Sequence, residues 1–401
     1  MDELPWSRRL LRRNNEWLLL ERLRSAGAAS RAQLARDSGL SKPTVSSALA
    51  ALEQAGLVRP AGTLAPERGR IAILYEPDPT AGHVLGIDIG RARLRTAVAD
   101  LSGALVARVD LPNRGRSAGS VADAVIDAAA RAVTAAGITS ADVVHVAVGT
   151  PGVFDPRTGR VQYAVNLPGW GRPGLFARIR ERLGIALSVH NDANLAALGE
   201  YAFGAGAGSP LFVYLLIGTG LGMGVVADGR LFEGAHGAAG EIGYLALMEE
   251  LPEAGRAPRR GVLEDAVSAD AVVRAARRCG MTGPLTAKRV FDAARAGSEP
   301  AIAAVQQEGR RLALVVASVS AVLDPDLVVL GGGVGHSADL LLDIVRSTLH
   351  RLTPLRPAVA PSALGEDAVL LGAIATALRT ARPLVFERRT ARAAGQDPSG
   401  T

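Results

Sequence analysis

The sequence predicts an α/β fold in two parts, a small helical N-terminal domain and a larger domain with repeated strand-turn-strand units. Three observations predict this organisation. The chain has 401 residues, more than the roughly 250–300 at which a single hydrophobic core stops growing. Its 48% hydrophobic residues and 46 glycines are typical of a folded α/β protein. Basic charge is concentrated in the first 70 residues, whereas strand patterns with glycine-rich turns begin after His83.

The composition excludes several classes of protein. The single cysteine, Cys279, excludes an internal disulfide and a multi-cysteine zinc site, which fits a reducing cytosol. Near the N-terminus the apolar run Leu18 to Leu20 is too short for the core of a signal peptide. The longest uncharged stretch, Leu211 to Ala227, is interrupted by glycines and is shorter than the ~20 apolar residues of a membrane helix. We therefore expect a cytoplasmic protein without a membrane partner.

Positive charge is unevenly placed along the chain. Residues 1–70 contain 12 Lys and Arg against 7 Asp and Glu, so this segment carries +5 of the formal net charge of +6. A polyanion such as nucleic acid is the partner that such a segment favours, although a solvated basic face has the same composition.

The N-terminal segment has the signals of three successive helices. Leucines recur at helical spacing from Glu16 to Leu23. Ser30 and Gln33 form a capping-box pattern that opens a second helix, which we expect to end at Gly39. Ser41 can then cap a third helix.

The third predicted helix has one apolar and one polar face. Pro43 lies in its first turn, where the missing N–H costs nothing. The apolar stripe consists of Val45, Ala48, Leu49 and Leu52. The opposite face has small side chains, which let a helix enter a DNA major groove. The DNA-contact candidates on this helix are Ser41, Lys42, Thr44, Ser46 and Ser47.

Two short strand patterns follow, Leu57 to Arg59 and Ile71 to Leu74, with Arg68 and Arg70 in the loop between them. They predict a wing whose arginines reach phosphates or a minor groove. Helices, turn and wing in this order predict a winged helix-turn-helix DNA-binding domain over residues 12–78. The alternative is a three-helix protein-interaction module, because short helices joined by tight turns occur in many folds without DNA.

Strand patterns dominate the larger region. Val84 to Gly90 is a buried strand pattern, and Leu94 to Ala99 and Leu105 to Val109 supply its partners. A comparable strand-turn-strand unit occupies Leu211 to Ala227. Two such units with glycine turns predict a duplicated architecture around a nucleotide cleft.

Glycines lie at the ends of three of these strands. Glycine turns let backbone N–H groups approach phosphate oxygens, although each turn taken alone is also explained as a tight turn. The third turn follows the apolar strand Leu327 to Leu330, at the edge where α/β sheets open their ligand crevices. The nucleotide-binding candidates are Asp88, Gly90, Gly218, Thr219, Gly220, Gly331, Gly332 and Gly333.

Six motifs then make a resemblance specific. They are Gly149-Thr150-Pro151-Gly152, Asn166 to Trp170, Asn191 to Asn194 with Gly199-Glu200, the Gly218 turn, Gly234 to Tyr244, and Gly261 to Glu264. In this order they resemble the ROK family, named for repressors, open reading frames and kinases, within the actin-like sugar kinases. The resemblance covers about residues 14–380.

The resemblance implies a duplicated actin-like, ribonuclease H-like sugar-kinase fold of two lobes over residues 83–380. Lobe 1 would comprise about residues 83–190 and the C-terminal helix, and lobe 2 about residues 191–365. Residues 381–401 are rich in Arg, Ala, Gly and Ser with little apolar periodicity, so we expect a mobile tail there.

The resemblance also implies a sugar site. In the family's kinases the aspartate of the Asn-Asp pair is the general base that takes a proton from the sugar hydroxyl, so Asp192 is the catalytic candidate if the chain is a kinase. Asp192 could also cap the helix that follows it. Carboxylates suit sugars because one group accepts from two hydroxyls. The sugar-binding candidates are Gly152, Asn166, Asn191, Asp192, Glu241, Tyr244 and Glu264.

The chain departs from the family's kinases in two places. Those kinases carry Asp-x-Gly-Gly-Thr-Lys at the first phosphate loop, whereas here Arg91 and Ala92 replace the second glycine and the threonine. The family's zinc site has lost its ligands, because Tyr244 replaces the histidine and Arg256 to Val262 contains no cysteine. We expect no zinc, and ATP with magnesium only if kinase activity is retained. Tyr244 would alter which sugar fits or pack in the core.

Two functions follow from these expectations. The first is a sugar-responsive repressor of carbohydrate uptake or catabolism genes, in which a homodimer or homotetramer binds palindromic double-stranded operator DNA and a small sugar is the effector. The second is an ATP-dependent kinase of a hexose or amino sugar that retains a DNA-binding domain. Asp192 and the glycine turns favour the second, and the altered phosphate loop favours the first.

Overall fold

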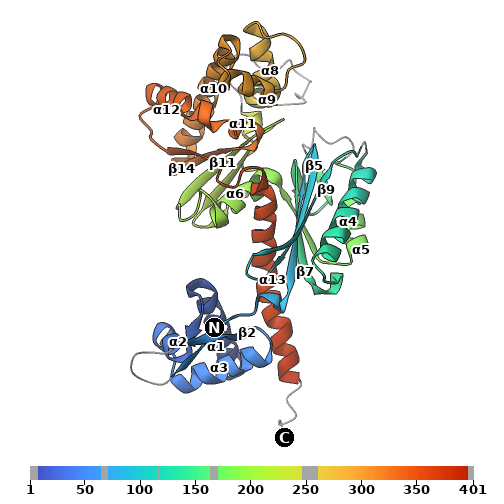
Figure 1. Ribbon diagram of the computed structural model, residues 1–401, viewed down its shortest axis with the longest axis vertical. Helices are drawn as coiled ribbons and strands as arrows, with labels where there is room; N and C mark the ends of the chain where they lie inside the picture. Colours follow the sequence, from blue (N-terminus) through green and yellow to red (C-terminus); the bar gives the residue numbers. More distant parts are fainter. Residues whose placement is uncertain (1–7, 65–70, 116, 163–169, 246–260, 396–401) are drawn as a thin grey trace.

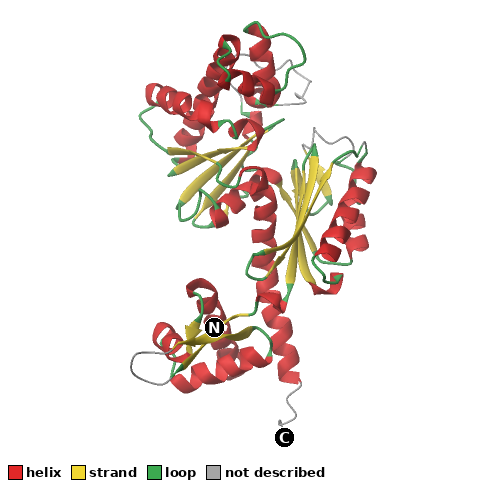
Figure 2. Cartoon of the chain, in the orientation of Figure 1, coloured by secondary structure: helices red, strands yellow, loops and turns green. Residues whose placement is uncertain are grey.

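Three groups of helices and strands follow one another along the longest axis of the molecule, and one long helix runs past two of them (Figure 1). The computed structural model describes residues 8–64, 71–115, 117–162, 170–245 and 261–395. The N-terminal domain lies at one end, a lobe with a five-stranded sheet lies in the middle, and a second lobe with its own sheet lies at the other end (Figures 1 and 2).

The N-terminal domain is a winged helix-turn-helix. Its helices are α1 (Arg8–Ala26), α2 (Arg31–Ser38) and α3 (Lys42–Gln54), and its strands are β1 (Ala29–Ser30), β2 (Val58–Leu64) and β3 (Ala72–Pro77). The strands form an antiparallel sheet in the order β1-β3-β2. The predicted apolar stripe of α3 is buried against α1, so this part of the fold prediction is confirmed.

The turns between these helices form where the sequence predicts them. Ser30 and Gln33 make the capping box of α2, and Gly39 ends that helix with φ 72°, a conformation that favours glycine. The Ser41 side chain accepts a hydrogen bond from the Thr44 backbone N–H and caps α3. The helix-turn-helix is therefore fixed by local signals.

Strands β2 and β3 form the predicted wing, and both extend beyond the strand patterns in the sequence. Arg68 and Arg70, the two arginines predicted at the wing, lie outside the described residues. A short 3₁₀ helix, η1 (Pro79–Ala81), then leads into the first lobe. The Asp78 carboxylate caps it by accepting from the Thr80 backbone N–H.

Lobe 1 is a mixed sheet covered on both faces. Its strands are β4 (His83–Ile89), β5 (Arg93–Asp100), β6 (Leu105–Pro112), β7 (Val143–Thr150) and β10 (Leu187–Asn191), in the order β10-β7-β4-β5-β6. Helices α4 (Ala118–Ala135) and α5 (Leu175–Leu183) cover one face, and α13 (Ala368–Gly395) covers the other. A hairpin of β8 (Val153–Asp155) and β9 (Arg160–Gln162) follows β7.

Lobe 2 repeats this sheet. Its strands are β11 (Leu211–Ile217), β12 (Leu221–Ala227), β13 (Arg230–Leu231), β14 (Leu327–Gly331) and β15 (Ala358–Pro361), in the order β13-β12-β11-β14-β15. In both lobes three consecutive antiparallel strands are extended by two parallel strands on the side of the first. The predicted duplication is confirmed.

Helices of lobe 2 cover its sheet on the side away from lobe 1. They are α7 (Val262–Val267), α8 (Ala269–Arg278), α9 (Ala287–Arg295), α10 (Glu299–Leu323), α11 (Gly332–Gly335) and α12 (Ala338–Leu352), with the 3₁₀ helix η3 (Ile242–Tyr244) before them. The largest of these helices bury their apolar faces in one core with β11, β12 and β14. This arrangement leaves the opposite face of the sheet for α6 (Asp192–Phe203).

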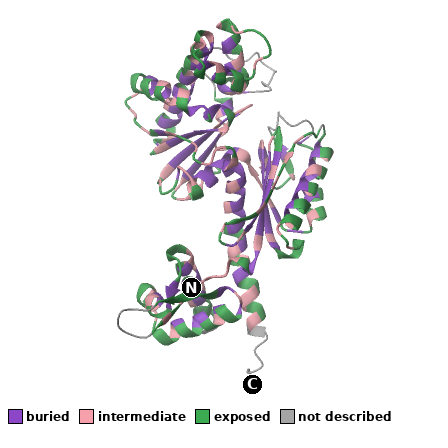
Figure 3. Cartoon of the chain, viewed as in Figure 1, coloured by how far each residue is buried: buried purple, intermediate pink, exposed green. Residues whose placement is uncertain are grey.

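Helices α6 and α13 join the two lobes. They cross where both carry glycine: a Cβ at Gly372 would lie 1.7 Å from the backbone O of Leu195, and a Cβ at Gly199 would lie 2.3 Å from the backbone O of Ala368. The two backbones therefore touch, and no larger residue fits at either position. The part of α13 between the lobes is almost entirely buried (Figure 3).

The structure corrects the prediction of a mobile tail for residues 381–395, whereas residues 396–401 lie outside the described residues. Helix α13 continues to Gly395 even though Pro383 lies inside it, and its last turns pack on the N-terminal domain. The ring of Phe386 meets Trp17 of α1 edge to face at 5.0 Å, which stabilises this part of the helix. Sequence periodicity missed it because contacts with a distant domain, and not an apolar stripe, hold it.

The region of α13 is also long and apolar. By length and composition Gly365–Ala393 could cross a membrane, the one such stretch among the described residues. Within its most apolar window 56% of the residues are buried inside the protein. Burial of this kind is typical of a core helix in a soluble protein.

Candidate functional site

A cavity of about 350 Å³ lies between the two lobes. The carboxyl ends of strands from both sheets and the first turn of α13 line it. Of the residues predicted from the sequence, it brings together Asp88, Gly90, Gly152, Asn191, Asp192, Gly218, Thr219, Gly220, Glu241, Glu264, Gly332 and Gly333. Sugar-binding and nucleotide-binding candidates thus share one cavity.

Two of the described residues that the sequence predicted for sugar or nucleotide binding, Tyr244 and Gly331, do not line the cavity, and the position of a third predicted residue is not described. Asn166 lies outside the described residues. Tyr244 is 40% exposed at the end of η3 and is not among the described residues that line the cavity, so it does not pack in the core as one alternative predicted. Gly331 faces the phenol of Tyr214, which a Cβ would meet at 1.8 Å, and Tyr214 lines the cavity in its place.

Asn191 and Asp192 lie at the junction of β10 and α6, which follow each other without a loop. The Asn191 side chain caps α6 by accepting from the Asn194 N–H at 3.1 Å, and its Nδ2 donates to the Gly152 carbonyl at 3.2 Å. The alternative in which Asp192 caps α6 is therefore wrong, because Asn191 is the cap. Asp192 accepts from the Ala193 N–H at 2.9 Å and lines the cavity.

Carboxyl groups with raised pKa values face one another in the cavity. Burial raises the pKa of Asp192 to about 6, although hydrogen bonds from backbone N–H groups lower it. Burial, with the charges of Asp192 and Glu264, raises the pKa of Glu241 to about 7. Near neutral pH such groups exist in both protonation states, so they can accept from hydroxyls and donate to them. Sugars offer hydroxyls of both kinds.

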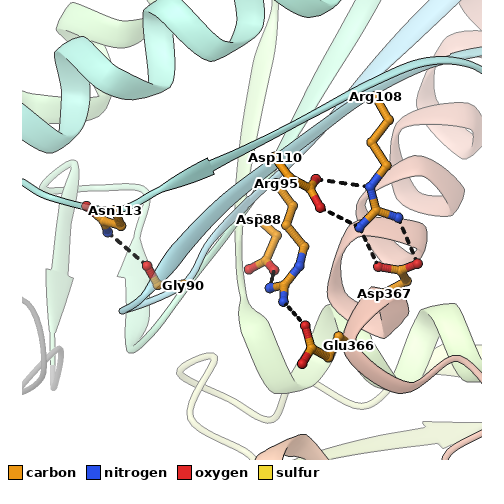
Figure 4. Close-up of polar contacts among 8 residues, drawn as sticks. All are labelled: Asp88, Gly90, Arg95, Arg108, Asp110, Asn113, Glu366 and Asp367. Atoms are coloured by element: carbon orange, nitrogen blue, oxygen red, sulfur yellow. Dashed lines mark hydrogen bonds and ion pairs between the residues drawn. The ribbon is translucent and has the colours of Figure 1, made fainter.

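An ion-pair network that sequence reasoning missed lines the lobe 1 side of the cavity, and Figure 4 shows its contacts. Nη1 of Arg95 lies 3.1 Å from Oδ2 of Asp88, and Nη2 of Arg95 bonds Glu366. The Arg95 side chain is 13% exposed and that of Asp88 is 6% exposed. Burial raises the pKa of Asp88 to about 7, although the adjacent Arg95 lowers it. The carboxylate of Asp88 therefore already holds a cation from its own chain.

A signal for part of this network was present in the sequence. Asp88 and Arg95 are directly opposed in the β4-β5 hairpin, so hairpin register alone predicts an oppositely charged cross-strand pair. Beside it, Arg108 of β6 binds both Asp110 and Asp367 (Figure 4). Glu366 and Asp367 belong to η4 (Gly365–Asp367), the turn that opens α13. The start of α13 is thus tied to β5 and β6 by charge.

The first phosphate loop is a closed hairpin turn. The Gly90 N–H donates to the Arg93 carbonyl at 2.9 Å, and Asn113 Nδ2 donates to the Gly90 carbonyl at 2.8 Å (Figure 4). This N–H is therefore not available to a phosphate oxygen. Arg91 also lines the cavity, where the family's kinases have glycine.

The DNA-contact residues that were predicted for the third helix lie together at the N-terminal end of α3. Ser41, Lys42, Ser46 and Ser47 are exposed and Thr44 is half-buried, with its hydroxyl 2.8 Å from that of Ser41. A shallow groove beside Thr44 and Ser47 also contains Arg12 and Asn15 of α1, which sequence reasoning did not select. The basic end of α1 thus adds a cation next to the predicted DNA-reading face.

A metal site is not evident in the described part of the chain, where no cluster of His, Cys, Asp and Glu could hold an ion. Most of the segment in which the family carries its zinc cysteines falls within residues 246–260, outside the described residues. The expectation of no zinc therefore rests on the missing histidine and cysteines in the sequence.

Comparisons with known proteins separate the two parts of the chain. A model described as "ROK family" matches residues 84–380, and one described as "MarR family" matches residues 13–59. A glucokinase of Halalkalibacterium halodurans is 31% identical over 309 residues, which are 72% of this chain and 92% of the glucokinase. A xylose repressor of Caldicellulosiruptor bescii is 25% identical over 385 residues, 91% of this chain and 96% of the repressor.

A solved structure has the same overall arrangement. A ROK family transcriptional regulator described as a homologue of the E. coli MLC protein superposes with a TM-score of 0.75 at 21% identity, covering 95% of this chain and 99% of that chain. The kinase likeness thus covers about the length of the two lobes, whereas the two likenesses to regulators cover nearly the whole chain. On the match over residues 84–380, the chain belongs to the ROK family.

Proposed function

We propose that this protein is a sugar-responsive transcriptional repressor of carbohydrate uptake or catabolism genes, acting in the cytoplasm. Its winged helix-turn-helix binds operator DNA, and the cavity between the lobes binds a sugar. The observation that carries this proposal is that one helix, α13, contacts both the cavity between the lobes and the winged domain. Ala368 and Val369 in its first turn line the sugar cavity, and Phe386 near its other end packs on the winged domain.

The sugar contacts would come from both lobes. Asn191 at the end of β10 in lobe 1, Asp192 at the start of α6, and Glu241 and Glu264 of lobe 2 line the same cavity. A sugar that bonds with both sets draws the lobes together, and it binds the closed arrangement more tightly than the open one. This difference in affinity is the requirement for a ligand to shift a conformational equilibrium.

The winged domain would respond because α13 holds it by several contacts. The Arg389 guanidinium donates to the carbonyls of Gly56 at 3.4 Å and Ala81 at 2.7 Å, bridging the end of the helix-turn-helix and the linker. Arg13 of α1 pairs with Glu387 of α13. Any movement of α13 relative to lobe 1 is therefore transmitted to α1 and to the base of the wing.

The second candidate function is an ATP-dependent sugar kinase with a retained DNA-binding domain. One observation favours it: the pKa of Asp192, raised to about 6 by burial, suits a general base at neutral pH. Against it stand Arg95 on Asp88 and the closed turn at Gly90, which occupy the groups that a nucleotide phosphate and its cation would use. We therefore expect sugar binding without turnover.

The operator would be palindromic. Regulators with one reading helix per chain bind as two-fold oligomers, so that two helices meet half-sites about one or more DNA turns apart. A homodimer or homotetramer of this chain would place two α3 helices in this way, with Ser41, Lys42, Thr44, Ser46 and Ser47 at the base edges. The wing arginines Arg68 and Arg70 would add phosphate or minor-groove contacts.

The test combines three measurements on the full-length protein. A thermal-shift screen over hexoses, pentoses and amino sugars selects the ligand, because binding to the folded state raises its melting temperature. Fluorescence anisotropy with DNA of the neighbouring promoter then measures operator affinity with and without that sugar at several salt concentrations. A coupled assay for ADP measures turnover. Absence of a specific DNA complex at every salt concentration contradicts the repressor, and ADP production that Asp192→Asn abolishes establishes the kinase.

The role of α13 is tested by Arg389→Ala. We expect this variant to bind both sugar and DNA while the effect of sugar on DNA affinity shrinks at least about threefold, because one of the contacts that transmits the movement is gone. Arg388→Ala, an exposed arginine on the same turn, is the matched control and should respond as the unchanged protein does. An unaltered sugar effect in Arg389→Ala would show that the signal travels elsewhere.

A further inference from the structure

A second cavity of about 350 Å³ lies at the joint between the winged domain and lobe 1. Its walls come from α1, the base of the wing, the linker before β4, the turn between β5 and β6, and α13. It shares no residue with the sugar cavity. Nothing in the function proposed above uses it.

The floor of this joint cavity is apolar. Leu20 and Leu23 of α1 are each 1% exposed, and Leu57 and Leu101 are similarly buried. These side chains come from the winged domain and from lobe 1, so the apolar surface is continuous across the joint. A ligand with an apolar body would find complementary walls there.

Two partly buried guanidinium groups stand over this floor. Arg24 of α1 is 15% exposed and pairs with Glu21, while Arg382 of α13 donates to the Leu101 carbonyl at 2.9 and 3.1 Å. Burial lowers the pKa of both arginines, although the charge of Glu21 raises both pKa values and that of Asp100 raises the pKa of Arg382. The charge of Arg382 lowers the pKa of Arg24 further. Carbonyl groups are neutral, so they satisfy the N–H groups of Arg382 without neutralising its charge.

The carboxylates that line the cavity already have partners. Glu76 forms an ion pair with Arg59 at 2.8 Å across the wing. The Oδ1 of Asp78 accepts from the N–H and the hydroxyl of Thr80 at 2.9 and 2.7 Å. Arg382, whose hydrogen bonds go to a neutral carbonyl, is thus the charged group at which an incoming anion would gain most, and Arg24, which pairs with Glu21, adds a second cation beside it. Guanidinium binds carboxylate and phosphate with two parallel hydrogen bonds.

We propose that the joint cavity binds a small organic anion, with an apolar body on the leucine floor and a carboxylate or phosphate head between Arg24 and Arg382. The ligand contacts the winged domain and the lobes at once, so it stabilises one placement of the DNA-reading head. It is a second effector site, separate from the sugar cavity, and it stands whether or not a sugar binds.

The test uses four probes on the full-length protein. Hexanoate and hexyl phosphate supply the two heads on one apolar body, 1-hexanol supplies the body alone, and inorganic phosphate supplies an anion alone. We expect at least one of the two organic anions to raise the melting temperature saturably, by about 2 °C or more at about 10 mM, and both controls to give less than half of that shift. No shift with either organic anion, or an equal shift with hexanol, overturns the proposal.

Variants locate the effect. Arg382→Gln and, separately, Arg24→Gln should weaken the anion response at least about tenfold in midpoint concentration, because each removes one charged donor pair. Arg388→Gln, an exposed arginine on the same helix, should respond as the unchanged protein does. The sugar-induced thermal shift, measured in parallel, shows that each variant is folded and tests the sugar site separately. An unchanged response in both Arg382→Gln and Arg24→Gln overturns the site.

Discussion

The two lobes repeat one sheet topology but differ at the hairpin that faces the cavity. In lobe 2 the turn between β11 and β12 carries Gly218, Thr219 and Gly220, and all three line the cavity with small groups. In lobe 1 the turn between β4 and β5 carries Arg91, and Arg95 behind it is bound to Asp88. Duplication preserves backbone topology, whereas a few side chains decide whether each hairpin receives a ligand or is filled by its own chain.

The largest expected effect comes from the joint that holds the two repeats together. Gly372→Ala places a Cβ 1.7 Å from the backbone O of Leu195, where a backbone and not a flexible side chain must move. We expect a loss of about 3 kcal/mol or more of unfolding free energy, measured by urea denaturation. Gly119→Ala in α4, where the nearest atom is 3.9 Å away, is the control and should be neutral or stabilising. Equal stability of the two variants would show that α6 and α13 do not cross as described.

The next largest effect is expected on sugar affinity, when Asp192 in the cavity between the lobes is replaced. Asp192→Asn keeps the shape but removes a charged acceptor, so sugar affinity should fall about 100-fold, equivalent to about 2.7 kcal/mol. Isothermal titration with the sugar selected by thermal shift measures it. Asp343→Asn, whose side chain is 98% exposed on α12, is the matched control and should leave the affinity unchanged. An Asp192→Asn protein with full affinity would place the sugar elsewhere.

A smaller effect is expected from making the lobe 1 hairpin resemble the family's kinases. Arg91→Gly with Ala92→Thr restores the second glycine and the threonine of the loop but leaves Arg95 on Asp88, so nucleotide binding should remain weak. Adding Arg95→Thr should tighten the binding of a fluorescent ATP analogue with magnesium at least about tenfold over the double variant. If the double variant already binds as tightly as the triple, Arg95 is not what fills the site.

The smallest effect concerns pH. The pKa of Glu241 in the folded chain is about 7, above its ordinary value of 4.5, so the folded state binds this proton more tightly than the unfolded state. The resulting stabilisation is present in full below the unfolded pKa and is lost as pH rises through about 7, so the melting temperature without sugar should fall between about pH 5 and pH 8. Calorimetry of Glu241→Gln should show a shallower fall, by a few °C, and the exposed control Glu53→Gln should not.

Most of the fold elements predicted correctly depend on residues that are close together in the sequence. The caps at Ser30 and Ser41, the Gly39 turn and the hairpins depend on residues within a few positions of one another, and the structure contains them all. Family motifs supplied most of the predicted residues that line the cavity between the lobes, since the order of short motifs survives when the surrounding sequence changes.

Contacts between distant residues were not predictable from the sequence alone. Arg95 and Glu366 are 271 positions apart and meet only because α13 begins at the edge of the lobe 1 sheet. The last turns of α13 have no apolar periodicity of their own and contain Pro383, so the sequence indicated a tail. Their stability comes from the winged domain, whose position no local pattern specifies.

The attachment of Arg389 has a consequence for how such regulators diversify. Its partners in the head are the main-chain oxygens of Ala55 and Gly56, which follow α3 and involve none of the side chains on its outer face. Substitutions on the outer face of α3 can therefore accumulate without loss of the contacts between the winged domain and α13. A lineage can acquire a new target sequence while keeping its metabolite response, because the contacts that hold the winged domain do not depend on which DNA bases α3 binds.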